Sequence, residues 1–219
     1  MSTAICIASG KGGTGKTSLS AGLSCCLAAL GNTVLAIDLD LGLRNLDLVL
    51  GMTEQAVFDF TDVLEGRVTL DAAVTAHVQI PSLHFLGAPL GLPREPVSVS
   101  ALGALVARAK EQYDYCVLDC PAGIGDGFRQ AAHAADRAIV VCTPDQTSLR
   151  DAQMTHFALR EAGVTDIRLV LNRARSKISA LPLDEIIDRT GLRLLGVVPE
   201  DRAVIAHANQ GTLLFSDLS

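Results

Sequence analysis

The sequence predicts a single α/β domain over residues 1–219, with a doubly wound, mostly parallel sheet and helices on both faces. Two observations lead to this class. Short runs of apolar or β-branched residues alternate with longer helical patterns, as in sheets that are buried on both sides. Proline or acidic residues stand just beyond several of these runs, where such sheets bind their ligands.

The strands are expected at residues 4–8, 33–37, 83–87, 116–118, 138–143, 168–171 and 195–198. Helical patterns lie near residues 17–29, 56–64, 98–112, 147–162 and 182–190. Gly31 is placed to end the first helix, because glycine readily takes the left-handed conformation found after a helix. Residues 88–98 contain three prolines and are expected to form a surface connection, since the α/β alternation continues beyond them.

The composition indicates a globular protein with a substantial core, because hydrophobic residues make up 49% of the chain. The formal net charge is −6 and no basic block occurs, so intrinsic binding to nucleic acid is not expected. No apolar run approaches the length of a membrane span, and no signal peptide is recognised. We therefore expect a cytoplasmic protein, or one attached peripherally to a membrane.

The most informative segment is SGKGGTGKTS at residues 9–18, which carries the P-loop frame Gly10-x-x-x-x-Gly15-Lys16-Thr17. Its glycines let backbone N–H groups wrap the phosphates of a nucleotide, Lys16 reaches the β- and γ-phosphates, and Thr17 offers a hydroxyl to Mg²⁺. Lys11 is surplus to this minimal cradle and requires another role. The expected ATP contacts in the loop come from Gly10, Lys11, Gly12, Gly13, Thr14, Gly15, Lys16, Thr17 and Ser18.

Three acidic residues follow two of the expected strands. Asp38 and Asp40 point the same way if the second strand continues through them, so one could organise Mg²⁺ and the other orient a water. Asp119 ends an apolar strand in the manner of a Walker B motif, whose acid supports the metal. The glycine-containing turn at residues 121–123 could sense the γ-phosphate through its backbone.

A pocket for the base is expected where two other strands end. Asn172 has one acceptor and two donors in its amide, which suits the edge of a purine, and Arg173 follows it. Pro199 and Asp201 come directly after the last strand, so the two loops could form the pocket together.

Together these residues closely resemble the MinD/ParA family of deviant Walker A ATPases, and within it the branch that places the division septum. The resemblance runs from the GKGGTGKT loop to the region of Gly211. Its most discriminating part is GLRNLDL at residues 42–48, and DCPAGI at 119–124 and GVVPED at 196–201 also match.

This resemblance implies an ATP hydrolase that dimerises with ATP held between the two subunits. Lys11 would reach the phosphates of the partner, where a second ammonium stabilises charge much as an arginine finger does. Asp40 would position the attacking water, and the ammonium of Lys16 would contact the β- and γ-phosphates. Thr17, Asp38 and Asp119 would hold Mg²⁺, and residues 146–151 would lie near the dimer face.

The same resemblance implies a division inhibitor of the MinC type and an ATPase stimulator of the MinE type as partners. Cys120 stands where the family often has serine. The last residues, GTLLFSDLS, lack the basic polar face of the family's amphipathic membrane-targeting tail. We therefore expect attachment to the inner face of the membrane only if such a tail exists beyond Ser219.

Other functions remain open. A related ATPase could position DNA or a flagellar apparatus, although the acidic charge balance and the sequence at residues 42–48 favour septum placement. A carrier of metal clusters is a remote alternative, suggested only by Cys116 and Cys120. The six cysteines lie mostly inside apolar runs, which favours reduced and packed thiols.

Overall fold

The computed structural model describes residues 2–53, 55–91, 96–174 and 181–210. The strands are β1 (Thr3–Ala8), β2 (Val34–Asp38), β3 (Thr75–Ala76), β4 (Leu83–Leu86), β5 (Tyr115–Asp119), β6 (Arg137–Cys142), β7 (Asp166–Ala174) and β8 (Arg193–Pro199). The longer helices are α1 (Lys16–Ala29), α5 (Val99–Ala109), α6 (Asp126–Ala134), α7 (Gln146–Glu161), α8 (Leu183–Thr190) and α9 (Arg202–Gln210). Short helices form at α2 (Leu46–Val49), α3 (Phe60–Leu64) and α4 (Leu70–Ala73).

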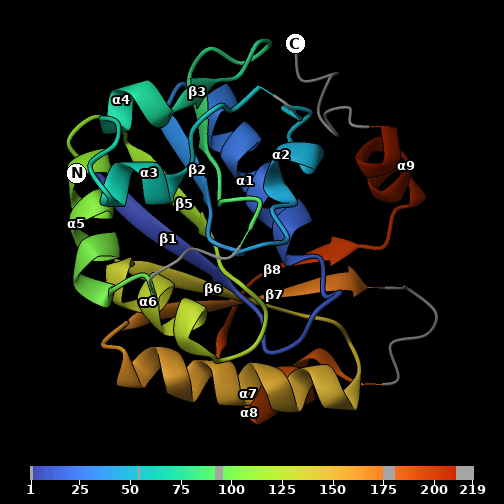
Figure 1. Cartoon of the computed structure of the whole chain (residues 1–219). Helices are drawn as coiled ribbons and strands as arrows, with labels where there is room; N and C mark the ends of the chain where they lie inside the picture. Colours follow the sequence, from blue (N-terminus) through green and yellow to red (C-terminus); the bar gives the residue numbers. More distant parts are fainter. Residues whose placement is uncertain (1, 54, 92–95, 175–180, 211–219) are drawn as a thin grey trace.

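The strands form one sheet in the order β3-β4-β2-β5-β1-β6-β7-β8. Only β3 runs antiparallel to its neighbour among the strand pairs described. Every other pair is parallel, and helices lie between successive parallel strands of the chain (Figure 1). The predicted class, a doubly wound and mostly parallel sheet, is confirmed.

The core has two layers, one on each face of the sheet. Side chains of α3 to α8 pack on one face, and those of α1 and α2 pack on the other. Strand residues alternate between the two layers, since successive side chains of a strand point to opposite faces. Figure 1 shows α7 and α8 together below the sheet, and α9 on the side of α1 and α2.

The predicted strands are all present, with ends that differ by at most three residues. Gly31 has φ +88° and follows the last turn of α1, as predicted. The helix expected near residues 56–64 is shorter, because it begins only at Phe60. The carboxylate of Asp59 accepts hydrogen bonds from the N–H groups of Thr61 and Asp62, and this cap sets the start of the helix.

The carboxyl ends of β1, β2, β5, β7 and β8 lie along the same edge of the sheet, because these strands are parallel. The loops that follow them carry the residues singled out from the sequence, so the topology brings those residues together. Among the described helices, none has both the length and the apolar character that a bilayer crossing requires. The tail at residues 211–219 lies outside the described residues.

Candidate functional site

The site begins with the glycine loop between β1 and α1. Gly15 has φ +88° and precedes the first residue of α1, and a Cβ there would lie 2.2 Å from the amide nitrogen of Asn172. A Cβ on Gly10 would lie 2.6 Å from the Cβ of Asp151 in α7. Both positions therefore require glycine, one for its conformation and for space, the other for space alone.

The loop has the features of a phosphate cradle. The hydroxyl of Thr14 is buried and has no hydrogen-bond partner within the described part of the chain. Buried polar groups are nearly always bonded, so an orphan of this kind indicates a missing ligand. The N-terminus of α1 lies directly after it, and a helix N-terminus attracts anions. The residues present thus fit a bound phosphate group.

Lys16 and Asp119 form a buried ion pair at the base of the loop. The ammonium of Lys16 lies 3.0 Å from Oδ1 of Asp119, and both side chains are less than a tenth exposed. The Ser20 hydroxyl donates to the same oxygen over 2.8 Å. Burial alone would lower the pKa of Lys16, but the carboxylate of Asp119 raises it above its usual value. Lys16 is therefore held charged, with donors left for a second anion.

Asp38 is fully buried, and its carboxylate accepts two hydrogen bonds from the backbone. β2 ends at Asp38, so the condition under which Asp38 and Asp40 would point the same way is not met. Oδ1 of Asp38 accepts from the N–H of Asp40 over 2.9 Å, and Oδ2 accepts from the N–H of Leu46 over 3.0 Å. Burial, with the nearby charge of Asp119, raises the pKa of Asp38 to about 6. Asp38 thus fixes the loop at residues 39–45, independently of any role in coordinating a metal ion.

Asp40 remains accessible, because its side chain is only partly covered. Burial raises the pKa of Asp40; the charge of Lys16 opposes this, and that of Asp119 adds to it. These electrostatic interactions place the Asp40 carboxylate close to the Lys16–Asp119 pair, although it does not pair with either. A carboxylate in this position could orient a water molecule.

The 39–45 loop is fastened by a buried arginine. The Nε of Arg44 donates to Asp47 over 2.9 Å, and the guanidinium carbon lies 5.7 Å from the ring centroid of Phe85. A Cβ on Gly87 would lie 3.0 Å from the same guanidinium, so only glycine leaves room for it. Arg44 also has φ +26°, a conformation that non-glycine residues rarely adopt. The sequence analysis recognised Arg44 only as part of the family resemblance and missed its burial.

The loop that follows β5 is tied to the glycine loop. The N–H of Gly123 donates to the carbonyl of Ser9 over 2.9 Å, and the hydroxyl of Ser9 donates to the carbonyl of Lys11 over 3.0 Å. A shift of the glycine loop on phosphate binding can therefore move the 120–125 loop through these hydrogen bonds. This is the segment expected to sense the γ-phosphate.

Lys11 turns away from Lys16 and lies against the start of α7. Its ammonium is 3.0 Å from Oδ1 of Asp145 and 3.1 Å from the hydroxyl of Thr147. Burial alone would raise the pKa of Asp145, but bonds from Thr143, Thr147 and the Ser148 N–H, together with Lys11, hold it well below its usual range. Sequence reasoning missed Asp145.

The residues expected around the base do line one hollow. It has a volume of about 330 Å³ and lies beside Gly15, between α1 and the carboxyl ends of β7 and β8. Asn172, Arg173, Pro199 and Asp201 all contribute to its wall. One amide hydrogen of Asn172 is bonded to the carbonyl of Thr14 over 2.7 Å, which leaves the other amide hydrogen and the amide oxygen for a ligand. The other lining residues are Gly15, Ser18, Leu19, Gly22, Leu23, Cys26, Val198, Glu200 and Val204.

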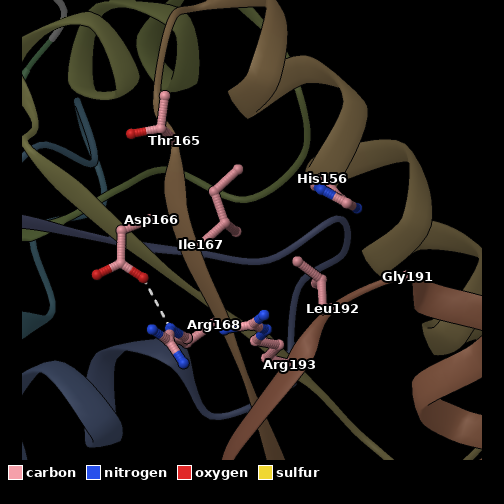
Figure 2. A pocket seen from close by; sticks show the side chains of 8 residues that line it. All are labelled: His156, Thr165, Asp166, Ile167, Arg168, Gly191, Leu192 and Arg193. Atoms are coloured by element: carbon pink, nitrogen blue, oxygen red, sulfur yellow. Dashed lines mark hydrogen bonds and ion pairs between the residues drawn. The ribbon is translucent and has the colours of Figure 1, made fainter.

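A second hollow of about 330 Å³ opens at the amino ends of β7 and β8, away from the glycine loop (Figure 2). Its wall holds His156 of α7 and the paired residues Arg168 and Arg193. Asp166 accepts from Arg168 over 2.7 Å and so offsets part of the positive charge. This hollow has no glycine-rich loop and no helix N-terminus in its wall, so it does not share the features of the nucleotide site.

The cysteines do not form the paired site that a cluster carrier would need. Cys116 and Cys120 are both fully buried, and the sulfur of Cys120 contacts that of Cys6 instead. Within the part of the chain that the structure describes, no three His, Cys, Asp or Glu side chains gather as a metal cage. Mg²⁺ needs less, because it usually takes one or two protein ligands together with phosphates and water.

Ser20 is the other residue that sequence reasoning missed. It lies one helical turn beyond Lys16, and its hydroxyl reaches both the Lys16 carbonyl and Asp119. Its spacing of four residues from Lys16 was the available signal, since residues four apart share a helix face.

The model of the CobQ/CobB/MinD/ParA nucleotide binding domain matches residues 5–214 of the chain. The septum site-determining protein MinD of Synechocystis is 37% identical over 215 residues, which cover 96% of this chain and 81% of that protein.

Two solved structures have the same fold. The MinC:MinD cell division protein complex of Aquifex aeolicus has a chain that is 34% identical, with a TM-score of 0.89, and the match covers 96% of this chain and 86% of that one. The septum site-determining protein MinD of Pyrococcus horikoshii, complexed with Mg-ADP, is 32% identical with a TM-score of 0.87. That match covers 98% of this chain and 88% of the other.

Proposed function

Because the chain belongs to the CobQ/CobB/MinD/ParA nucleotide-binding family, we propose that it is an ATP-operated switch that times placement of the division septum. The observation that carries the proposal is the buried Lys16–Asp119 pair beneath a glycine loop whose Thr14 hydroxyl has no partner among the described residues. The similarity to septum site-determining proteins over nearly the whole chain supports the cellular role.

The loop backbone and Lys16 bind the phosphates of ATP, and the hollow beside Gly15 holds the base through Asn172 and the residues after β8. Thr17, Asp38 and Asp119 would hold Mg²⁺, in keeping with the Mg-ADP complex of the Pyrococcus horikoshii relative. The chemistry that Mg²⁺ would supply there is neutralisation of phosphate charge.

Asp40 orients the attacking water, since its carboxylate is the accessible one beside the Lys16–Asp119 pair. Lys11 acts in a second subunit, where its ammonium stabilises the charge that develops on the leaving phosphate. To do so it must leave Asp145 and Thr147, so the exchange of partners by Lys11 couples the ATP state to dimerisation.

Partners follow from the relatives. A chain of the Aquifex aeolicus complex is bound to MinC, so we propose a MinC-like division inhibitor as one partner and an ATPase stimulator as another. We propose that the switch works in the cytoplasm, and at the inner face of the cell membrane as a peripheral protein if an amphipathic tail exists beyond Ser219.

Substitution of Asp40 tests the catalytic proposal. We expect Asp40→Asn to bind ATP with unchanged affinity but to lose about 100-fold or more in turnover, because the orienting carboxylate is gone while the side-chain shape is kept. Lys16→Ala should lose ATP binding as well. Phosphate release and fluorescence titration measure the two effects. Turnover in Asp40→Asn equal to that of the parent would contradict the assignment.

A further inference from the structure

Two buried cysteines meet directly beneath the proposed magnesium site. The sulfurs of Cys6 in β1 and Cys120 after β5 are 2.9 Å apart, and both side chains are fully buried. This separation is shorter than the van der Waals contact of two sulfur atoms, and either thiol could be the donor. The Cys120 thiol also lies 3.6 Å from the carbonyl of Leu118.

We propose that Cys6 and Cys120 form a reversible disulfide that switches the nucleotide site off under oxidising conditions. The sulfurs need to close from 2.9 Å to about 2.05 Å, a small movement for a covalent bond. No other chemistry of the site uses either thiol. The assignment of the bond rests on geometry alone, and only its effect on turnover rests on the proposed function.

The bond would shift the chain at the end of β5. Cys6 lies opposite Leu118 in the parallel pair, so Cys120 is its diagonal neighbour, two residues further along. A disulfide shortens the sulfur separation from 2.9 Å to about 2.05 Å. Formation of the bond therefore draws Cys120 toward Cys6.

That shift acts on the residues that hold phosphate and metal. Cys120 directly follows Asp119, which accepts from Lys16 and Ser20. Its own N–H is bonded to the carbonyl of Ile7 over 3.2 Å, one residue before the end of β1. Movement of Cys120 thus displaces Asp119 and weakens the backbone hydrogen bond between Cys120 and Ile7. We therefore expect ATP turnover to fall.

The reaction balances with a peroxide as the oxidant. Hydrogen peroxide oxidises one thiol to a sulfenic acid and releases water, and the second sulfur then attacks it and releases another water. Two thiols and one peroxide thus give one disulfide and two waters. A small dithiol reverses the reaction by thiol–disulfide exchange.

The experiment uses the full chain with Cys26→Ser, because Cys26 is the exposed cysteine among those described and could cross-link molecules. The protein is treated with hydrogen peroxide, excess peroxide is removed, and free thiols are blocked after unfolding. Peptide mass mapping without reductant should show the Cys6 and Cys120 peptides joined, with a mass lower by two hydrogen atoms. Turnover should fall at least fivefold and return with dithiothreitol.

Two matched variants separate this bond from general oxidation. Cys6→Ala should keep its turnover after peroxide, because no disulfide can form. Cys116→Ala should remain sensitive, since Cys116 is buried in β5, the strand that Cys120 follows, and no sulfur contact involves it among the described residues.

Free Cys6 and Cys120 thiols, under conditions that fully oxidise Cys26 in the parent chain, would overturn the proposal. So would a complete cross-link that leaves turnover unchanged, or loss of turnover on oxidation of Cys6→Ala. If the reduced chain hydrolyses no ATP, the proposed function has failed. The peptide map and the affinity for a fluorescent ADP analogue would then still decide this inference.

Discussion

Lys11 lies at the edge of the glycine loop with its ammonium on Asp145 and Thr147 of the same chain. The lysine and Asp145 are 35% and 46% exposed, so the pair is open to water and can be broken at low cost. Under the proposed function Lys11 acts in another subunit, so the weak ion pair with Asp145 would have to break before Lys11 could reach the partner's nucleotide.

Asp145→Asn should make ATP-dependent dimerisation easier. The asparagine still accepts the N–H of Ser148 that caps α7, but it no longer attracts the Lys11 ammonium. An exposed ion pair contributes at most about 1 kcal/mol, and each dimer releases two of them, so the dimer dissociation constant should fall by up to about 30-fold. Sedimentation equilibrium measures it. Asp166→Asn, a carboxylate of similar exposure at the other end of the sheet, should leave it unchanged.

At the scale of elements, the 39–45 loop and α2 are held to the rest of the fold at several points. Asp38 binds the backbone of Asp40 and Leu46, and Arg44 pairs with Asp47 over the ring of Phe85. A ring nitrogen of His77 lies 3.0 Å from the carbonyl of Leu50, the residue that caps the C-terminus of α2. These bonds fix where Asp40 stands, although only Asp40 would meet the water.

Arg44→Ala should lower the free energy of unfolding by about 3 kcal/mol, because it leaves Asp47 buried without its partner. Both residues carry a Cβ, so the strain of the positive φ angle is the same in parent and variant. Denaturant unfolding measures the loss. The double variant Arg44→Ala/Asp47→Ala should be more stable than Arg44→Ala, since no charge remains unpaired. If the double variant proved less stable, the ion pair would not be the cause.

His77 should make stability depend on pH. Its Nδ1 accepts the N–H groups of Gln79 and Ile80, so the ring must be neutral, with its proton on Nε2 for the carbonyl of Leu50. Burial lowers the pKa of His77 below 6.5. A lowered histidine pKa stabilises the fold above pH 6.5, and this contribution is lost as pH falls through the folded-state value.

The measurement is thermal unfolding between pH 5 and 8. The parent should lose stability below pH 6.5, and His77→Asn should show a shallower slope, because asparagine can still accept from residues 79 and 80. Part of the slope should remain, since burial also lowers the pKa of His84. The exposed His133→Asn variant should behave as the parent does. Identical slopes in His77→Asn and the parent would rule out His77 as the titrating group.

At the scale of the whole molecule, the order of strands explains why a short sequence pattern can locate the site. Parallel strands β1, β2 and β5 are neighbours, so the residues that follow them meet at one edge. The apolar runs predicted these strands, and the glycines, lysine and acids at their ends predicted the site.

What the sequence did not predict depends on contacts between distant segments. Lys11 and Asp145 are 134 residues apart, and Cys6 and Cys120 are 114 residues apart. No periodicity connects such pairs, since only the completed sheet places them side by side. The bonds from the backbone of Asp40 and Leu46 to Asp38 also depend on the folded loop, and no sequence pattern predicted them.

The most direct test of the account is the oligomeric state of the chain with each nucleotide. Sedimentation velocity should show a dimer with ATP and a monomer with ADP, and Lys11→Ala should remain a monomer with both. The Asp40→Asn background keeps ATP intact during the run. Dimerisation of the Lys11→Ala protein with ATP to the same extent as the parent would contradict the central claim that Lys11 joins two subunits through the nucleotide.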